Sequence, residues 1–155
     1  MKTFIPFLCC PLTIPFQLFN YPGQGVAFSD FSYYSQAVEV SNIAKLSGQG
    51  GWNERGEIPY VFEQELETTY DNILRALQSA NSKLSFDDVY SVRSFRNDLR
   101  SSFKPLVQVS KRRFPNHRPT WTAVEVSKLA LDTVHTEVEI EALLPEKNGP
   151  RTGNN

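Results

Sequence analysis

The chain has 155 residues, of which 40% are apolar and 21% charged, so it can bury one core and is too short for two comfortable domains. Sixteen Lys and Arg against seventeen Asp and Glu give a net charge of −1, which excludes a protein-wide positive field that recruits nucleic acid or an anionic membrane. The two cysteines, Cys9 and Cys10, are adjacent, which excludes a secreted disulfide scaffold.

The two ends of the chain differ in composition from the rest. Residues 1–19 are apolar but contain Pro6, Pro11 and Pro15, which interrupt any helix long enough to cross a membrane. A cleaved secretory signal is the weaker alternative, because no small-residue cleavage site follows. We expect an N-terminal extension over residues 1–19, one domain over 20–145 and a disordered tail over 146–155.

The first elements predicted in the domain are a β-hairpin and a helix. Residues 37–40 and 43–46 alternate and are separated by the turn pair Ser41-Asn42. A glycine-rich loop at 48–51 ends the hairpin. After Pro59, apolar residues recur at helical spacing and predict a helix over residues 60–80. They are Phe62, Leu66, Tyr70, Ile73, Leu77 and Ala80.

The second half of the sequence predicts strands over residues 88–96, 120–128 and 136–144. Between the first two of these strands it predicts a helix, with Ser101 or Ser102 as the N-cap and Pro105 in the first turn. The order is ββ-α-β-α-ββ. This order predicts an α+β fold, a mixed sheet with two helices on one face. The last strand alternates Val138 and Ile140 with glutamates, and an acidic face must meet water or another subunit, so we expect an oligomer.

Five motifs follow one another at a characteristic spacing, and together they resemble the YjgF/RidA superfamily over residues 20–145. They are Tyr34-Ser35-Gln36-Ala37-Val38, Leu46-Ser47-Gly48-Gln49-Gly50-Gly51-Trp52, Gly56-Glu57-Ile58 with Tyr70-Asp71-Asn72-Ile73, Pro119-Thr120-Trp121-Thr122-Ala123-Val124-Glu125-Val126 and Val138-Glu139-Ile140-Glu141-Ala142. The resemblance implies a chorismate-mutase-like fold and a homotrimer with an inner β-barrel and ligand pockets at the subunit clefts. The chain is most similar to a fungal and bacterial branch.

One residue departs from the pattern of the enamine and imine deaminases in this superfamily. The resemblance implies that an arginine in a Pro-Ala-Arg segment holds the substrate carboxylate in two hydrogen bonds. The matching position here is Trp121, whose indole has an apolar face and a single donor. Arg118 lies three residues upstream, and we expect it to be a solvated turn residue rather than a replacement.

The remaining site residues are implied by the same resemblance. Tyr34 matches a pocket tyrosine, and Ser47, Gly48 and Gln49 match a wall of the cleft. Glu139 matches a glutamate that positions water or moves a proton. Partial burial between subunits would raise its pKa and suit acid/base work, while a structural glutamate on the trimer seam is the alternative.

Other candidate residues point to ordinary structure. His117 and His135 lack Cys, Asp or Glu at metal-ligand spacing, so we expect neither metal nor cofactor. A thiol function for Cys9 or Cys10 is disfavoured without a nearby base. The run Lys111-Arg112-Arg113 is expected to complement a helix C-terminus rather than to bind RNA.

The function expected is a cofactor-independent small-molecule enzyme that acts on an imine, an enamine or a related enolisable centre by proton transfer or water addition, with Glu139 as the acid/base. By family association this step belongs to fungal specialised metabolism and is not standard 2-imino acid deamination. The alternative is a non-catalytic ligand-binding or protein-protecting trimer. We expect an uncharged or aromatic substrate, a homotrimer, no nucleic-acid or membrane partner, and a cytoplasmic location.

Overall fold

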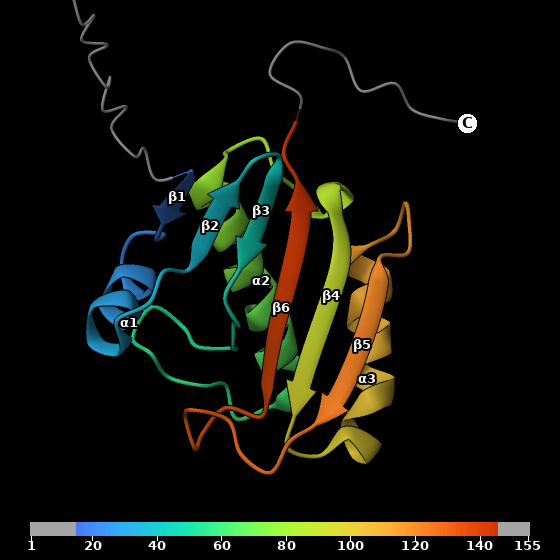
Figure 1. Ribbon diagram of the computed structural model, residues 1–155. Coiled ribbons are helices and arrows are strands. Elements are labelled where there is room, and N and C mark those ends of the chain that lie inside the picture. Colours follow the sequence, from blue (N-terminus) through green and yellow to red (C-terminus); the bar gives the residue numbers. More distant parts are fainter. Residues whose placement is uncertain (1–14, 146–155) are drawn as a thin grey trace, which may run out of the picture.

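The computed structural model describes residues 15–145, which form one six-stranded sheet with helices packed against it (Figure 1). The predicted tail and most of the predicted extension lie outside this range. The elements are β1 (Phe16–Phe19), α1 (Gln24–Ser32), β2 (Ala37–Val40), β3 (Ile43–Leu46), α2 (Phe62–Ala80), a 3₁₀ turn (Phe86–Asp88), β4 (Val89–Arg96), α3 (Leu99–Arg113), β5 (Thr120–Glu125) and β6 (Thr136–Leu143).

The sheet is mixed, as predicted. Its strand order is β1-β2-β3-β6-β4-β5, and only the β4–β5 pair is parallel. A parallel pair needs a crossover, and α3 supplies it between β4 and β5. The predicted α+β class is confirmed.

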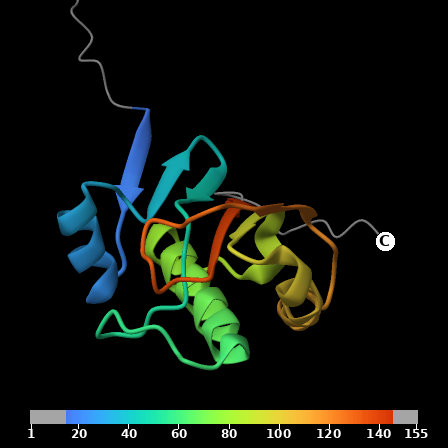
Figure 2. The same cartoon turned by 90° about the horizontal axis from the view of Figure 1, so that it is seen from below.

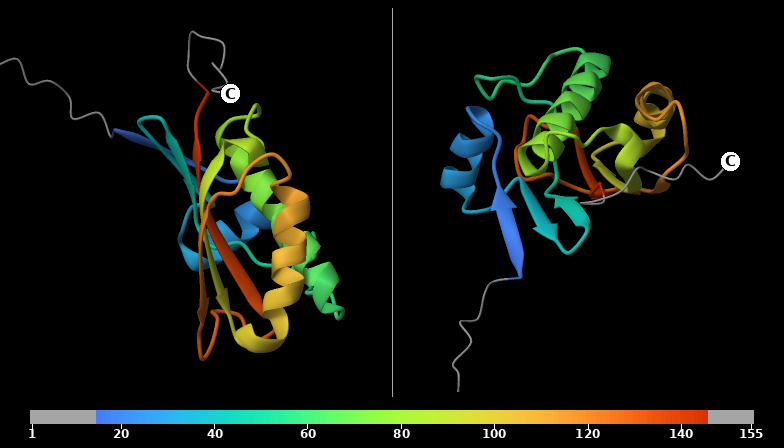
Figure 3. Two further views of the ribbon diagram at one scale, coloured as in Figure 1. Left: turned by 90° about the vertical axis from the view of Figure 1, so that its right-hand side faces the viewer. Right: turned by 90° about the horizontal axis from the view of Figure 1, so that it is seen from above.

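The helices α2 and α3 cover one face of the sheet, which leaves the opposite face, hereafter the open face, without a helix (Figures 2 and 3). Within residues 15–145, no helix combines the length and the apolar content needed to cross a membrane. The core lies between the sheet and the helices α2 and α3.

The predicted stripe on α2 is confirmed. Leu66, Tyr70, Ile73 and Leu77 are fully buried, because residues three and four apart share one face of the helix. In β6 the predicted alternation also holds: Val138 and Ile140 are buried against the helices while the glutamates lie on the open face.

Two elements were not predicted, β1 and α1. The strand β1 pairs with β2 in antiparallel register, so the sheet includes residues that the sequence analysis assigns to the N-terminal extension. The helix α1 has no apolar stripe, and its only buried residue is Gly25, where an added Cβ would lie 2.7 Å from the Tyr21 ring. A helix that packs through a glycine gives no hydrophobic periodicity.

The start of α3 differs from the prediction. The N-cap is Asp98, whose carboxylate accepts a hydrogen bond from the Ser101 amide at 3.1 Å, so neither Ser101 nor Ser102 caps the helix. Pro105 consequently lies inside the helix rather than in its first turn. Aspartate is an equally good cap, which makes the choice among Asp98, Ser101 and Ser102 ambiguous from sequence.

Asn72 on α2 fixes the glycine-rich loop that follows β3. Its Nδ2 donates to the carbonyl oxygens of Gly50 and Trp52, both at 2.8 Å. At Gly51 the backbones are so close that an added Cβ would lie 2.4 Å from the Glu65 carbonyl oxygen. The position of the loop therefore depends on α2.

The variant Asn72→Ala should lower the free energy of unfolding by about 1–3 kcal/mol, because it leaves two buried carbonyl groups without a donor. Urea titration followed by circular dichroism measures this change. The control Gln78→Ala, at an exposed position of the same helix, should change it by less than about 0.5 kcal/mol. Equal effects of the two variants would contradict the role of Asn72.

Candidate functional site

Four residues predicted for the site lie together where β3 ends and β6 begins. They are Tyr34, Ser47, Gly48 and Gln49. The Gln49 amide donates to the Val138 carbonyl at 3.0 Å, and the Val138 amide donates back at 2.9 Å. The Gln49 side chain donates to Gln36 Oε1 at 2.7 Å, and Gln36 Nε2 donates to the Tyr34 hydroxyl at 2.8 Å. These hydrogen bonds connect Gln49 with Tyr34 through the side chain of Gln36.

The buried amides at this cluster leave one acceptor free. Gln49 Oε1 is buried and has no hydrogen-bond partner within residues 15–145. Burial also raises the pKa of the Tyr34 hydroxyl, which therefore remains protonated and able to donate.

Glu137 is the carboxyl group that approaches this cluster. A Cβ added at Gly48 would lie 1.9 Å from Glu137 Oε1, so only glycine leaves room for the carboxyl group as it stands. Burial raises the pKa of Glu137, and the neighbouring Glu139 raises it further. The raised pKa makes Glu137 a potential proton donor beside Tyr34 and Gly48.

Glu139 lies on the open face of β6, on the same side as Glu137. Its Oε2 is 3.5 Å from the Arg93 guanidinium on β4. The next glutamate along the strand, Glu141, is 3.7 Å from the Lys45 ammonium and accepts from the Tyr90 hydroxyl at 2.7 Å. Glu139, the predicted acid/base residue, is therefore paired with a cation, as is Glu141 beside it.

Trp121 lies on the helix-covered face. Its neighbours in register are Val92 on β4 and, beyond it, Ile140 on β6, both buried. The indole Nε1 donates to Ser94 Oγ at 3.0 Å, and Phe103 of α3 stacks on the indole with ring centroids 5.6 Å apart and planes at 10°. Trp121 and Glu139 thus point to opposite faces, and a single copy does not bring them into one cavity.

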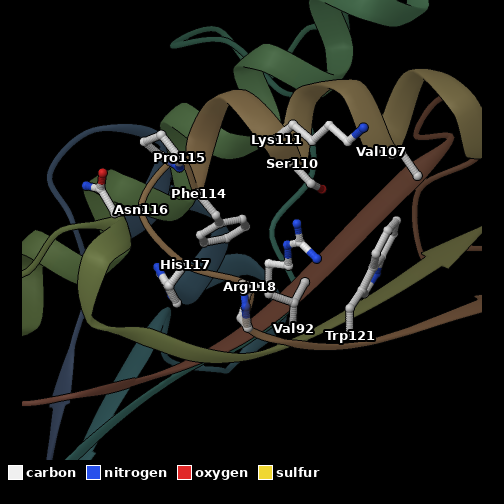
Figure 4. Close-up of a pocket in the computed structure, with 11 residues that line it drawn as sticks. Val92, Val107, Ser110, Lys111, Phe114, Pro115, Asn116, His117, Arg118 and Trp121 are labelled. Carbon is white, nitrogen blue, oxygen red and sulfur yellow. The ribbon is translucent and has the colours of Figure 1, made fainter. Parts of the chain in front are cut away.

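A pocket of about 780 Å³ opens beside Trp121, between the end of α3 and the start of β5 (Figure 4). Arg118 points into it, with its guanidinium between Phe114 and Trp121 in this view. Arg118 is exposed and lies in the turn before β5, as expected, and it also lines the pocket.

Three contributors were missing from the predicted site: Gln36, Glu137 and Arg118. Gln36 stands within the first quoted motif, and Glu137 shares a face with Glu139 by alternation, so both gave a usable signal. The direction of the Arg118 side chain depends on the turn that follows α3, and only the prolines of this turn are recognisable from sequence.

The two histidines are engaged in other interactions. His117 Nε2 lies 2.6 Å from the Val89 carbonyl oxygen, and His135 Nδ1 lies 2.8 Å from the buried carboxylate of Glu65. Within residues 15–145, no three His, Cys, Asp or Glu side chains lie close enough to hold a metal ion.

Replacement of Glu137 by Gln should change the pH dependence of stability. Because its folded-state pKa is raised, Glu137 contributes stability that is fully present below the ordinary glutamate pKa of about 4.3 and is lost as the pH rises through the raised value. The melting temperature of Glu137→Gln should therefore exceed that of the wild type at pH 8, and the two should converge near pH 4. A variant that is less stable at pH 8 would contradict this account.

Known proteins resemble this chain in sequence and in fold. The family model described as Endoribonuclease L-PSP matches residues 25–144. A RutC family protein, YjgH, from Escherichia coli is 33% identical over 116 residues, which cover 74% of this chain and 85% of the relative. A 2-iminobutanoate/2-iminopropanoate deaminase from Dermatophagoides farinae is 30% identical over 113 residues, covering 72% and 84% of the two chains.

A solved structure of the protein YJGH superposes with a TM-score of 0.76 at 28% identity, covering 86% of this chain and 100% of that one. The match to the family model extends from α1 to the end of β6, so it includes the amide cluster, the open face and the pocket beside Trp121. The chain therefore belongs to the Endoribonuclease L-PSP family, within the YjgF/RidA superfamily.

Proposed function

We propose that the protein is a cofactor-independent small-molecule enzyme that acts on an imine, an enamine or a related enolisable substrate. Membership in the superfamily and similarity to an imine deaminase support the chemistry. The observation that supports the more specific assignment is the pocket lined by Trp121, the residue that the resemblance matches to the deaminase arginine.

The proposed reaction needs one group that moves a proton and one surface that orients the substrate. When water adds to a C=N carbon, its oxygen bonds to the carbon as the C=N double bond becomes single, a carboxylate takes one proton from the water, and the nitrogen takes up a proton. The C–N bond then breaks as the hydroxyl group loses its proton to form C=O, and the nitrogen takes up a further proton and leaves as the amine. We assign Glu139 to the first proton transfer. Glu137, with its raised pKa, is placed to return a proton to the nitrogen.

The substrate surface would combine Trp121 with the amide cluster. Tyr34, Ser47 and Gly48 offer a hydroxyl group and backbone groups, and the buried side chains of Gln36 and Gln49 hold them in place. An aromatic substrate would contact the indole, and small 2-imino acids would lack the arginine that usually holds them. The protein is therefore proposed to differ from standard 2-imino acid deaminases.

Assembly into a homotrimer would unite the two faces. The open face carries an apolar patch formed by Phe16, Leu18, Val40 and Leu143, each between 41% and 59% exposed. Exposed apolar residues gathered on one face are typical of a protein interface. In this proposed assembly, a neighbouring copy packed there brings its own Trp121 pocket towards the open face, where Glu139 lies.

A non-catalytic ligand-binding or protein-protecting trimer is the alternative. Compounds that raise the melting temperature without being turned over would favour it.

The test of catalysis is Glu139→Gln, assayed by product release from a panel of 2-aminoacrylate-type imines and cyclic enamines. The variant should lose about 100-fold or more in rate, which is the usual contribution of a positioned acid/base. The control is Glu141→Gln, a substitution of the same type on the same face of β6, and it should keep the wild-type rate.

Sedimentation of both variants separates catalysis from assembly. Both should sediment like the wild type. A Glu139→Gln variant that turns over substrate at the wild-type rate would contradict the assignment, and so would rapid ammonia release from small 2-imino acids by the wild type.

A further inference from the structure

The pocket beside Trp121 is positively charged. Its lining contains Lys111 and Arg118 and no Asp or Glu, although the chain as a whole carries a net charge of −1. The negative end of the α3 dipole, about half an elementary charge, lies near the same wall. Two full positive charges on the side chains outweigh it.

These two cations have no partner within residues 15–145, whereas their neighbours do. Arg112 and Arg113 extend to α2, where both bind Glu67 and Arg113 also binds Asp71 at 2.8 Å. The side chains of Lys111 and Arg118 make no ion pair, hydrogen bond or ring contact in this range. The prediction that the run Lys111-Arg112-Arg113 complements the end of a helix is borne out, since all three residues lie in the last turn of α3. Lys111 lines the pocket as well.

The pocket also offers a flat apolar surface. Phe103 covers one side of the Trp121 indole and does not line the pocket, so the indole meets the pocket with surface that Phe103 leaves free. Phe114, Val92 and Val107 complete the apolar lining. Figure 4 shows the Arg118 guanidinium between the two aromatic rings, with Lys111 extending from α3 above it.

We propose that this pocket binds a planar, conjugated carboxylate, with its ring against Trp121 and its carboxylate on Arg118. A guanidinium presents two parallel donors that match the two oxygens of a carboxylate, and Lys111 adds a second positive charge. Arg118 then anchors the substrate from the turn before β5, in place of the arginine that is absent at Trp121. This inference rests on the proposed function, since it names the substrate class of that site. It keeps the expected aromatic substrate but replaces an uncharged one with an anion, because Lys111 and Arg118 line the pocket.

The proposal also explains why small imino acids are poor candidates. A volume of about 780 Å³ lies in the range of pockets that hold ring-containing ligands. A small aliphatic acid would leave the indole without a contact. A rigid ligand with a ring and an anionic group would contact both the Trp121 indole and the cations Lys111 and Arg118.

Calorimetric titration of the full chain with cinnamate and with its neutral amide, cinnamamide, tests the proposal. Cinnamate should bind about 10-fold tighter than cinnamamide or better, and Arg118→Gln should remove most of this difference. Lys111→Gln should reduce it less. The matched control Arg112→Gln, from the same run but outside the pocket, should keep it. The saturated 3-cyclohexylpropanoate should bind more weakly than cinnamate.

Equal affinities for the acid and the amide would overturn the proposal, as would an unchanged preference in Arg118→Gln. Phenyl phosphate that binds more tightly than cinnamate would overturn the choice of a carboxylate. Because the titration needs no turnover, cinnamate binding without activity on any imine would contradict the proposed function alone. Turnover of imines without a preference for the acid would contradict this inference alone.

Discussion

The alternation of side chains along β5 and β6 is the constraint on which any site in this protein depends. Because successive residues of a strand point to opposite faces, Trp121 shares the helix-covered face with Val92 and Ile140, while Glu139 lies on the open face. A cavity that uses both residues therefore needs a second copy. The same alternation places Glu137 beside Glu139, where burial raises its pKa.

The sequence predicted those elements whose residues bury apolar side chains at a regular spacing. The helix α2 and the strand β6 follow this rule, and the hairpin adds a turn at Ser41, which adopts a φ of 57°. The strand β1 is short and three of its four residues are exposed, and α1 packs through Gly25, so neither produces a pattern. Packing of this kind is fixed by tertiary contacts and is invisible to periodicity.

In the candidate site, too, some residues could be predicted from sequence and others depend on tertiary contacts. Resemblance identified Tyr34, Ser47, Gly48 and Gln49, which the structure gathers into one cluster. It could not reveal which glutamate approaches that cluster, because this depends on the space that Gly48 leaves free. Nor could it show that Arg118 turns into a pocket. In the proposed site, the anchoring charge lies at Arg118, three residues before Trp121.

Mixing two inactive variants tests most directly whether the site joins two copies. Trp121→Ala and Glu139→Gln should each be inactive, but random trimers assembled from equal amounts of both would contain intact sites at the clefts where a wild-type Trp121 meets a wild-type Glu139. The account predicts recovery of about one quarter of the wild-type rate. If mixed trimers form and remain inactive, the two residues do not cooperate across copies, and the account is contradicted.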